Sequence, residues 1–279
     1  MSGGEPLFKD RIKLSGDIKL YSREIGTIIG DGRKDVYAFE LVVRNRPGVT
    51  FRLGQMFAEN NVNILNFTHS DTREDEVLIY IVGDFSKATG KPEEILEIIQ
   101  REEDIIIEAR YAPSVSYSYY SRHLFPLTIG GNRVIMFGPA NIYGLIKGLK
   151  DNLGEMAYGI LKNVGYAVGE EYYNYYVKAK GLTKDDIEEI LNFLSAQLLS
   201  YGWARMENIK ISRDRIEFDL YDYWECVVNK VGGERKTSSY MLGALYGLFE
   251  KLYGKRVVIK EVKCQALGDE YCRFRIDII

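Results

Sequence analysis

Four residues near the C-terminal end have the chemistry and the spacing of a metal site. Glu261 precedes Cys264 by three residues, and Cys272 follows Cys264 by eight. Apolar residues alternate on both sides of the turn at Gly268-Asp269, which predicts a hairpin that brings the two thiols together. A carboxylate and two thiolates supply three ligands of a tetrahedral Zn²⁺, and Cys226 is the only other cysteine. The sequence therefore predicts a structural zinc site formed by Glu261, Cys264, Cys272 and Cys226.

Two other interpretations of these thiols stay open. A disulfide between Cys264 and Cys272 is compatible with the hairpin, and the composition supports this alternative. Lys, Glu and Tyr are abundant and only two His are present, which resembles a thermophile, where disulfides occur inside the cell. The third interpretation is reduced thiols that fill a core, because unmodified Cys is among the most buried residue types.

Length, charge and hydropathy restrict the classes of protein that fit. The chain has 279 residues, enough for two domains of ordinary size. Its net charge of −3 and pI of about 5.7 give no electrostatic basis for direct nucleic-acid binding, which depends on neutralising phosphates. The charged N-terminus lacks the apolar stretch of a secretory signal, and the longest apolar run, 240–249, is too short to span a bilayer. We therefore expect a cytoplasmic protein without a membrane segment.

The first half of the chain has the hydrophobic pattern of a split β-α-β unit. An apolar strand at 39–43 is followed by a breaker and then by apolar residues at helical spacing up to residue 57. Two strands at 62–65 and 77–82 form a predicted hairpin, and a second helix around 95–99 precedes a strand at 105–107. The order β-α-β-β-α-β is that of a ferredoxin-like unit.

A Pro-Gly turn and a later Asn-Ile pair carry a family resemblance within residues 36–110. The sequence Asn45-Arg46-Pro47-Gly48-Val49, followed at helix length by Asn63-Ile64, resembles the ACT domain. The resemblance implies that copies pair through their sheets or helices and that an amino acid binds at the interface. Glycine admits close backbone approach, and helix N-terminal amides favour a carboxylate. The expected ligand-binding residues are Asn45, Pro47, Gly48, Val49, Asn63 and Ile64.

We divide the chain into four segments: an N-terminal extension (1–34), an ACT-like domain (35–111), a linker rich in Ser and Tyr (112–123) and a C-terminal domain (124–279). The C-terminal domain has predicted helices at 141–149, 155–177, 183–200 and 239–253, and strand patterns at 209–220 and in the closing hairpin. Thr183 and Asp186 form a capping box. The expected fold class is α+β in both domains.

The closing hairpin resembles the end of a 4-vinyl reductase domain, in which an acidic residue and a Cys precede a Gly-Asp turn and a second Cys. This resemblance, over about residues 124–279, implies a small-molecule sensing module. Aromatic-compound sensors of this kind hold zinc through a Glu, the two hairpin cysteines and another cysteine before the penultimate helix. Residues 236–239 here read Lys-Thr-Ser-Ser, so Cys226 must supply the fourth ligand from elsewhere.

Aromatic residues on the helices of the C-terminal domain predict an apolar ligand pocket, because such pockets are lined by aromatic side chains with few polar groups. We expect Tyr158, Tyr166 and Trp203 among its lining. The alternative is that aromatic residues at helical spacing fill the core. Phenol-sensing relatives anchor the hydroxyl with a histidine, and no histidine follows His123, which argues against phenol recognition by that chemistry.

No nucleotide-binding glycine pattern and no nucleophile elbow occurs in the sequence. The sequence thus favours a binding protein over an enzyme. We expect a regulatory sensor that binds an amino acid, an apolar or aromatic compound, or both, forms a homodimer or higher homo-oligomer, and acts through a partner. The alternatives are an enzyme or accessory biosynthetic protein that uses the second pocket, and a protein-interaction scaffold.

Overall fold

The structure is a computed structural model that describes residues 35–70, 74–113, 126–129, 131–231 and 237–279. The described residues divide into two compact units, 35–135 and 136–279. The predicted N-terminal extension and most of the predicted linker lie outside the described residues. No helix among the described residues has the length and apolar character that a membrane span requires.

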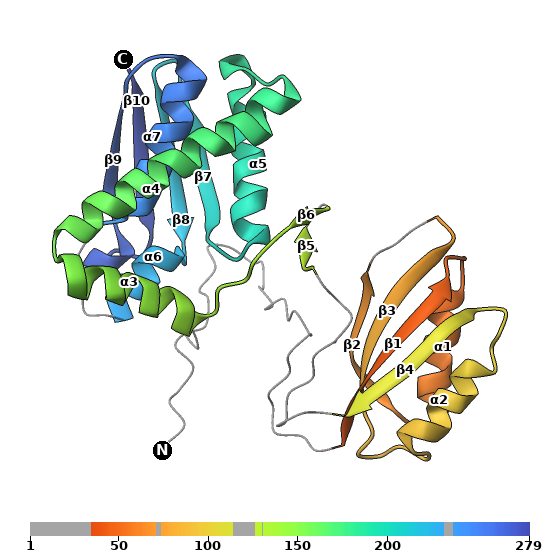
Figure 1. The fold of residues 1–279 in the computed structure, drawn as a ribbon. Coiled ribbons are helices and arrows are strands. Elements are labelled where there is room, and N and C mark those ends of the chain that lie inside the picture. The colour runs from red at the N-terminus through yellow and green to blue at the C-terminus, as the bar shows by residue number, and fades with distance from the viewer. Residues whose placement is uncertain (1–34, 71–73, 114–125, 130, 232–236) are drawn as a thin grey trace. The chain divides into compact units, whose positions relative to one another are not determined.

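The first unit is a four-stranded antiparallel sheet with two helices (Figure 1), in the strand order β2-β3-β1-β4. The predicted ferredoxin-like order is confirmed. Its elements are β1 (Val36–Arg44), α1 (Val49–Glu59), β2 (Asn63–Ser70), β3 (Glu76–Asp84), α2 (Pro92–Gln100) and β4 (Ile106–Pro113), followed by the short strands β5 (Thr128–Ile129) and β6 (Asn132–Arg133).

Alternation along β1 explains the packing of this unit. Phe39, Leu41 and Val43 are fully buried in one cluster with Leu53 and Phe57 of α1, because every second residue of a strand points to the same face. Gly48 precedes α1 with a φ of +89°, a conformation that residues with a Cβ rarely adopt.

The second unit is an antiparallel sheet in the order β7-β8-β10-β9 with helices packed against it (Figure 1). The predicted α+β class is therefore confirmed. Its elements are α3 (Pro139–Leu153), α4 (Met156–Tyr172), the π-helical turn η1 (Tyr173–Val177), the 3-10 turns η2 (Lys178–Lys180) and η3 (Lys184–Asp186), α5 (Ile187–Ser200), β7 (Arg205–Ile211), β8 (Arg215–Tyr221), α6 (Trp224–Val231), α7 (Ser239–Tyr253), β9 (Val257–Lys263), η4 (Gln265–Leu267) and β10 (Cys272–Ile278).

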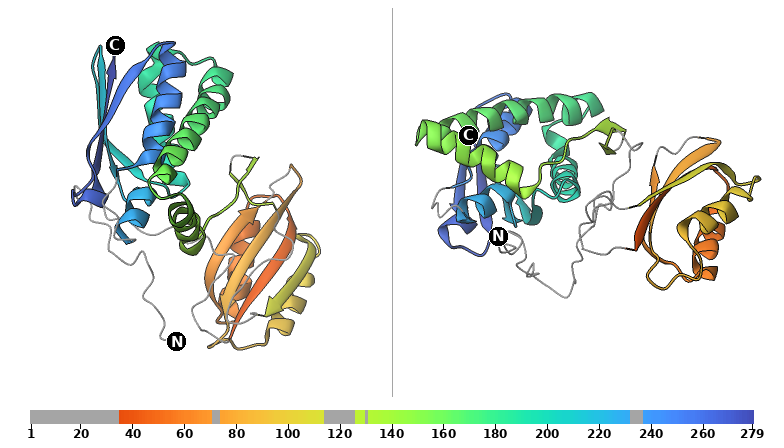
Figure 2. Two further views of the ribbon diagram at one scale, coloured as in Figure 1. Left: turned by 60° about the vertical axis from the view of Figure 1, so that its left-hand side comes forward. Right: turned by 60° about the horizontal axis from the view of Figure 1, so that its bottom comes forward.

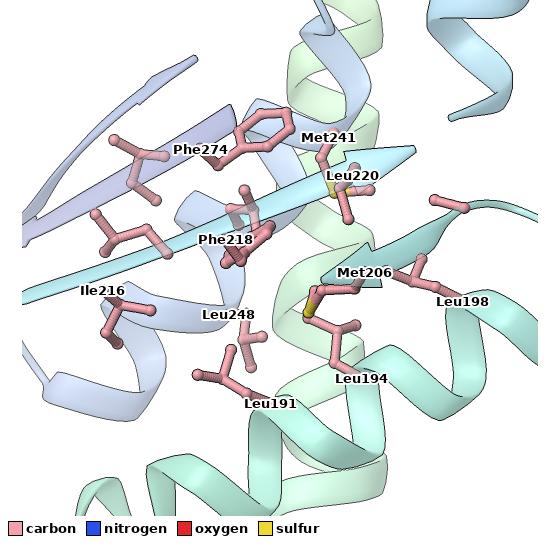
Figure 3. Packing of buried hydrophobic residues seen from close by; sticks show 14 of the residues in the cluster. Leu191, Leu194, Leu198, Met206, Ile216, Phe218, Leu220, Met241, Leu248 and Phe274 are labelled. Atoms are coloured by element: carbon pink, nitrogen blue, oxygen red, sulfur yellow. The ribbon is translucent and has the colours of Figure 1, made fainter. Parts of the chain in front are cut away.

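The main core of this unit lies between the sheet and two helices (Figure 3). Leu191 of α5 and Leu248 of α7 pack with Phe218 of β8 and Phe274 of β10. The two phenylalanine rings are stacked 5.8 Å apart on neighbouring strands, where such cross-strand pairs stabilise a sheet.

Helices α4 and α7 are in backbone contact where glycines of both helices meet (Figure 2). A Cβ added to Gly165 would lie 2.1 Å from the carbonyl oxygen of Tyr240, and one added to Gly243 would lie 2.0 Å from that of Lys162. Gly169 and Gly247 meet the opposite helix in the same way. We call these four glycines the glycine seam. No larger residue fits this approach, which explains why helix-weakening glycines occur here.

The observed helices differ from the predicted ones in two places. The predicted helix at 155–177 is α-helical only to Tyr172 and continues as the π-helical turn. The two-turn helix α6 (Trp224–Val231) was not predicted. The predicted helix at 239–253 has the observed bounds of α7, and the predicted capping box at Thr183 is present.

Candidate metal centre and aromatic triad

The structure brings together the four residues that the sequence predicts as metal ligands. The ligand atoms of Cys226, Glu261, Cys264 and Cys272 all lie within 4.8 Å of one another. The Sγ of Cys226 is 3.6 Å from that of Cys264 and 3.2 Å from that of Cys272. No disulfide joins any of the three cysteines, and all of them are buried.

Three separate elements place these side chains. Helix α6 carries Cys226, strand β9 carries Glu261 with Cys264 directly after it, and Cys272 begins β10. The hairpin is closed by η4, and Gly268 at its end has a φ of +108°. The backbone N–H of Cys264 donates to the Asp269 carboxylate (2.8 Å). The Gly-Asp turn therefore sets the separation of the two hairpin cysteines, while α6 delivers the third.

Ser238 fills the position at which the aromatic-compound sensors that the hairpin resembles have a cysteine. Its backbone N–H donates to one Glu261 oxygen (2.7 Å) and its hydroxyl donates to the other (2.9 Å). The Ser238 Oγ also lies 3.0 Å from the Cys226 Sγ. Ser238 thus orients both Glu261 and Cys226, as the residues behind a metal ligand usually do.

The electrostatics of this cluster oppose the gathering of negative charge. Hydrogen bonds from the other two thiols lower the pKa of Cys264, whereas the pKa of Cys226 and that of Cys272 are raised by hydrogen bonding within the cluster and by burial. Burial raises the pKa of Glu261 to about 8. A divalent cation would reverse this balance, since it favours the ionised form of every ligand.

The donor set fits Zn²⁺. Three thiolates and one carboxylate form a recognised tetrahedral set, and Zn–S bonds of about 2.3 Å place the sulfurs of a tetrahedron roughly 3.8 Å apart. The two Sγ separations of 3.2 and 3.6 Å require only a slight opening of the cluster. Four protein ligands would leave no open position, so a bound ion would be structural.

Three aromatic rings meet beside the metal cluster, at the start of α7. The ring centroids of Trp203, Trp224 and Tyr240 are 5.7 to 6.3 Å apart, with interplanar angles of 63° to 72°. We call these residues the aromatic triad. The indole Nε1 of Trp224 is buried and has no hydrogen-bond partner among the described residues. Buried donors are nearly always satisfied, so this N–H calls for an acceptor.

Glu225 connects the triad to the metal cluster. Its buried carboxylate accepts hydrogen bonds from the backbone N–H groups of Tyr240 (3.1 and 3.2 Å) and Met241 (3.4 Å) and from the Tyr223 hydroxyl (3.2 Å). Burial raises the pKa of Glu225 to about 7. The carboxylate satisfies amides at the N-terminus of α7 that the helix itself leaves unpaired.

The three aromatic residues predicted to line the pocket have different surroundings. Trp203 belongs to the aromatic triad. Tyr166 of α4 donates its hydroxyl to Glu250 of α7 (3.0 Å), which raises its pKa. Tyr158 lies under the Lys150 ammonium, 5.5 Å from the ring centroid. None of the described ring contacts joins Tyr158 or Tyr166 to Trp203.

The six residues predicted to bind an amino acid lie in two groups at opposite ends of the first sheet. Asn45, Pro47, Gly48 and Val49 follow β1, and the Asn45 N–H donates to the carbonyl of Asp75, just before β3. Asn63 and Ile64 start β2 and pair with the last residues of β3. At the first end, the Thr50 hydroxyl lies 3.1 Å from the Nε2 of His69. The structure therefore does not assemble the six residues into one site within a single chain.

Sequence reasoning missed Trp224, Tyr240, Glu225 and Ser238 as site residues. The one local signal was the run Tyr223-Trp224-Glu225-Cys226, which combines aromatic rings, a carboxylate and a thiol. Their convergence depends on the placement of α6 against α7, which no residue spacing in the sequence records.

Comparison with known proteins agrees with both resemblances. The family model of the ACT domain matches residues 37–104, and that of the 4-vinyl reductase domain matches residues 226–278, so the two predicted families are confirmed in the predicted order. No curated protein matches the chain.

Solved structures similar to this chain include three whose descriptions differ. The phenol-responsive sensory domain of the transcription activator PoxR, with phenol, is 23% identical over 54% of this chain and 79% of that one, with a TM-score of 0.46. A vinyl-4-reductase family protein from Methanocaldococcus jannaschii is 14% identical over 52% and 84%, with a TM-score of 0.35. A trafficking protein particle complex subunit 3 from Naegleria fowleri, covalently bound to palmitic acid, is 18% identical over 50% and 92%, also with a TM-score of 0.35.

Proposed function

We propose that this chain, which carries an ACT domain followed by a 4-vinyl reductase domain, is a small-molecule-sensing regulatory protein. The second unit, which contains the 4-vinyl reductase domain, binds an apolar or aromatic compound, and a structural Zn²⁺ at Cys226, Glu261, Cys264 and Cys272 holds the frame of that site. The ACT domain pairs copies of the chain and binds an amino acid. Output passes to a partner.

The observation that carries this proposal is the aromatic triad with its unsatisfied indole N–H. A ligand that places a carbonyl, carboxylate or phenolic oxygen against the Trp224 Nε1 would supply the missing acceptor, while the three rings bury its apolar body. The metal cluster supports this placement, because Cys226 holds α6 and Ser238 holds the start of α7. Both helices carry residues of the triad, so the cluster preorganises the ligand site.

The ACT half of the proposal needs a second copy. Asn45 to Val49 and Asn63 to Ile64 lie at opposite ends of the sheet in one chain, so a ligand that touches both groups must lie between two copies. Such an arrangement couples amino-acid binding to pairing, because the ligand stabilises only the paired state. Binding in either domain can regulate a partner only if the ligand favours one arrangement of the chain over another.

A thermal-shift screen of the full chain with amino acids and small aromatic acids, aldehydes and phenols tests the proposal. We expect at least one compound to raise the melting temperature, because a ligand at 100 times its Kd stabilises by about 2.7 kcal/mol. For an aromatic hit, Trp224→Phe removes the N–H but keeps a ring and should weaken binding at least tenfold. Tyr253→Phe, at the other end of α7, is the matched control and should bind normally. A screen in which no compound stabilises the protein would refute the proposal.

A further inference from the structure

Helix α4 has an exposed apolar face that the proposed function does not use. Met156, Ile160, Val164 and Val168 recur every fourth residue, and their side chains are 70%, 36%, 49% and 40% exposed. Residues four apart lie on one side of a helix, so these side chains form one stripe, which we call the α4 stripe. Ala157, Leu161, Gly165 and Gly169, each one position further along, are buried.

The α4 stripe carries no charge over its whole length. Lys162 is the only charged residue between Met156 and Val168, and its ammonium lies over the Tyr246 ring of α7, 4.8 Å from the centroid. The stripe extends over about 18 Å of helix at 1.5 Å per residue. Exposed helix faces of soluble proteins normally carry charged residues, whereas depletion of charge is typical of the centre of an interface.

We propose that the α4 stripe is the surface through which the second units of two copies of this chain pair, with the two α4 helices antiparallel and Val164 at the two-fold axis. In this arrangement Ile160 of one copy faces Val168 of the other, and Val164 meets its own equivalent. A two-fold contact must be complementary to itself. A stripe of branched aliphatic residues, symmetric about its middle and without charge, fulfils this condition.

The area of the stripe is compatible with this occupant. The exposed apolar side chains offer on the order of 400 Å², within the range at which patches on soluble proteins mark interaction sites. A standard interface buries about 800 Å² per partner, so the stripe would form the centre of the contact and its polar surroundings the rim. The glycine seam fixes the opposite side of α4 to α7, so the stripe is presented on a rigid helix.

Cross-linking of the full chain gives a readout local to α4, even where the ACT domain also pairs copies. In the Val164→Cys variant the introduced thiol lies at the two-fold axis, so a short bis-maleimide should link two chains covalently. Leu199→Cys on α5, where Leu199 is 60% exposed, is the matched control and should give at least fivefold less dimer. The unchanged chain reports on the native, buried cysteines.

A second variant tests the energetics of the same contact. Val164→Glu places two carboxylates together at the axis and should raise the dissociation constant at least tenfold in analytical ultracentrifugation, whereas Leu199→Glu should leave it unchanged. Equal cross-linking of the Val164→Cys and Leu199→Cys chains would overturn the proposal and indicate that a different protein covers the stripe or that it stays exposed. Ligand binding in the thermal-shift screen is a separate measurement, so this outcome would leave the proposed function standing.

Discussion

The glycine seam between α4 and α7 allows a stability prediction with a built-in control of opposite sign. In Gly243→Ala, the new Cβ would lie 2.0 Å from the Lys162 carbonyl oxygen, roughly 1.5 Å short of an ordinary contact of about 3.5 Å. The opposing atoms belong to a helix backbone and cannot rotate away, so the two helices must separate.

The magnitude follows from two opposing contributions. Overpacking of a core costs typically about 1–3 kcal/mol, and a clash with helix backbone belongs at or above the upper end of that range. Alanine recovers about 1 kcal/mol because it is the better helix former. We therefore expect Gly243→Ala to lower the free energy of unfolding by at least about 2 kcal/mol.

The matched control is Gly159→Ala on α4. This glycine is exposed and nothing lies within 4 Å of its added Cβ, so the substitution should stabilise by up to about 1 kcal/mol. Both tryptophans lie in the second unit, so urea unfolding followed by tryptophan fluorescence reports on that unit alone. If Gly243→Ala unfolds within about 0.5 kcal/mol of the original chain, a difference typical of substitutions that disturb nothing, the close approach of the helices is wrong.

Three further predictions concern the second unit. Asp219 is 1% exposed and accepts two hydrogen bonds from the Arg273 guanidinium (2.7 and 2.9 Å) and one from Asn208 (2.9 Å); Asp219→Ala should destabilise by about 3 kcal/mol in urea unfolding, because a broken buried ion pair leaves an uncompensated charge, and a loss below about 1 kcal/mol would contradict this. Thr183→Ala removes the side-chain cap on Asp185 N–H and should cost about 1 kcal/mol, whereas Thr237→Ala, outside any helix, should cost less in the same assay. Chelation at neutral pH should expose three reactive thiols to a thiol reagent and lower the melting temperature, and readdition of Zn²⁺ should restore both; unchanged thiol reactivity after chelation would speak against a bound ion.

The sequence was informative wherever a local pattern determines the structure. Strand alternation around Phe39 and Leu41, and the positive φ that Gly48 must adopt, define the ferredoxin-like unit. The start of α7 and the hairpin of Cys264 and Cys272 follow from spacing and turn chemistry alone. These features depend on residues close together in the chain.

The features that were missed depend on contacts between distant segments. Cys226 reaches the hairpin only because α6 packs beside it, and an eight-residue helix has too few turns for a recognisable apolar period. The glycines of α4 suggested close packing or space for a ligand; only the position of Gly243 on α7 decides for packing. The π-helical turn after Tyr172 interrupts a pattern that looks continuous in the sequence.

The metal content of the full chain tests most directly the claim that its thiols brace a ligand-binding unit instead of reacting. Protein purified without added metal should contain one Zn²⁺ per chain by inductively coupled plasma mass spectrometry, with the same mass increment in native mass spectrometry. Cys226→Ala should lose most of this zinc, although it leaves the hairpin ligands intact. Protein that contains no metal and in which three thiols react freely, or zinc retained in full by Cys226→Ala, would contradict the account.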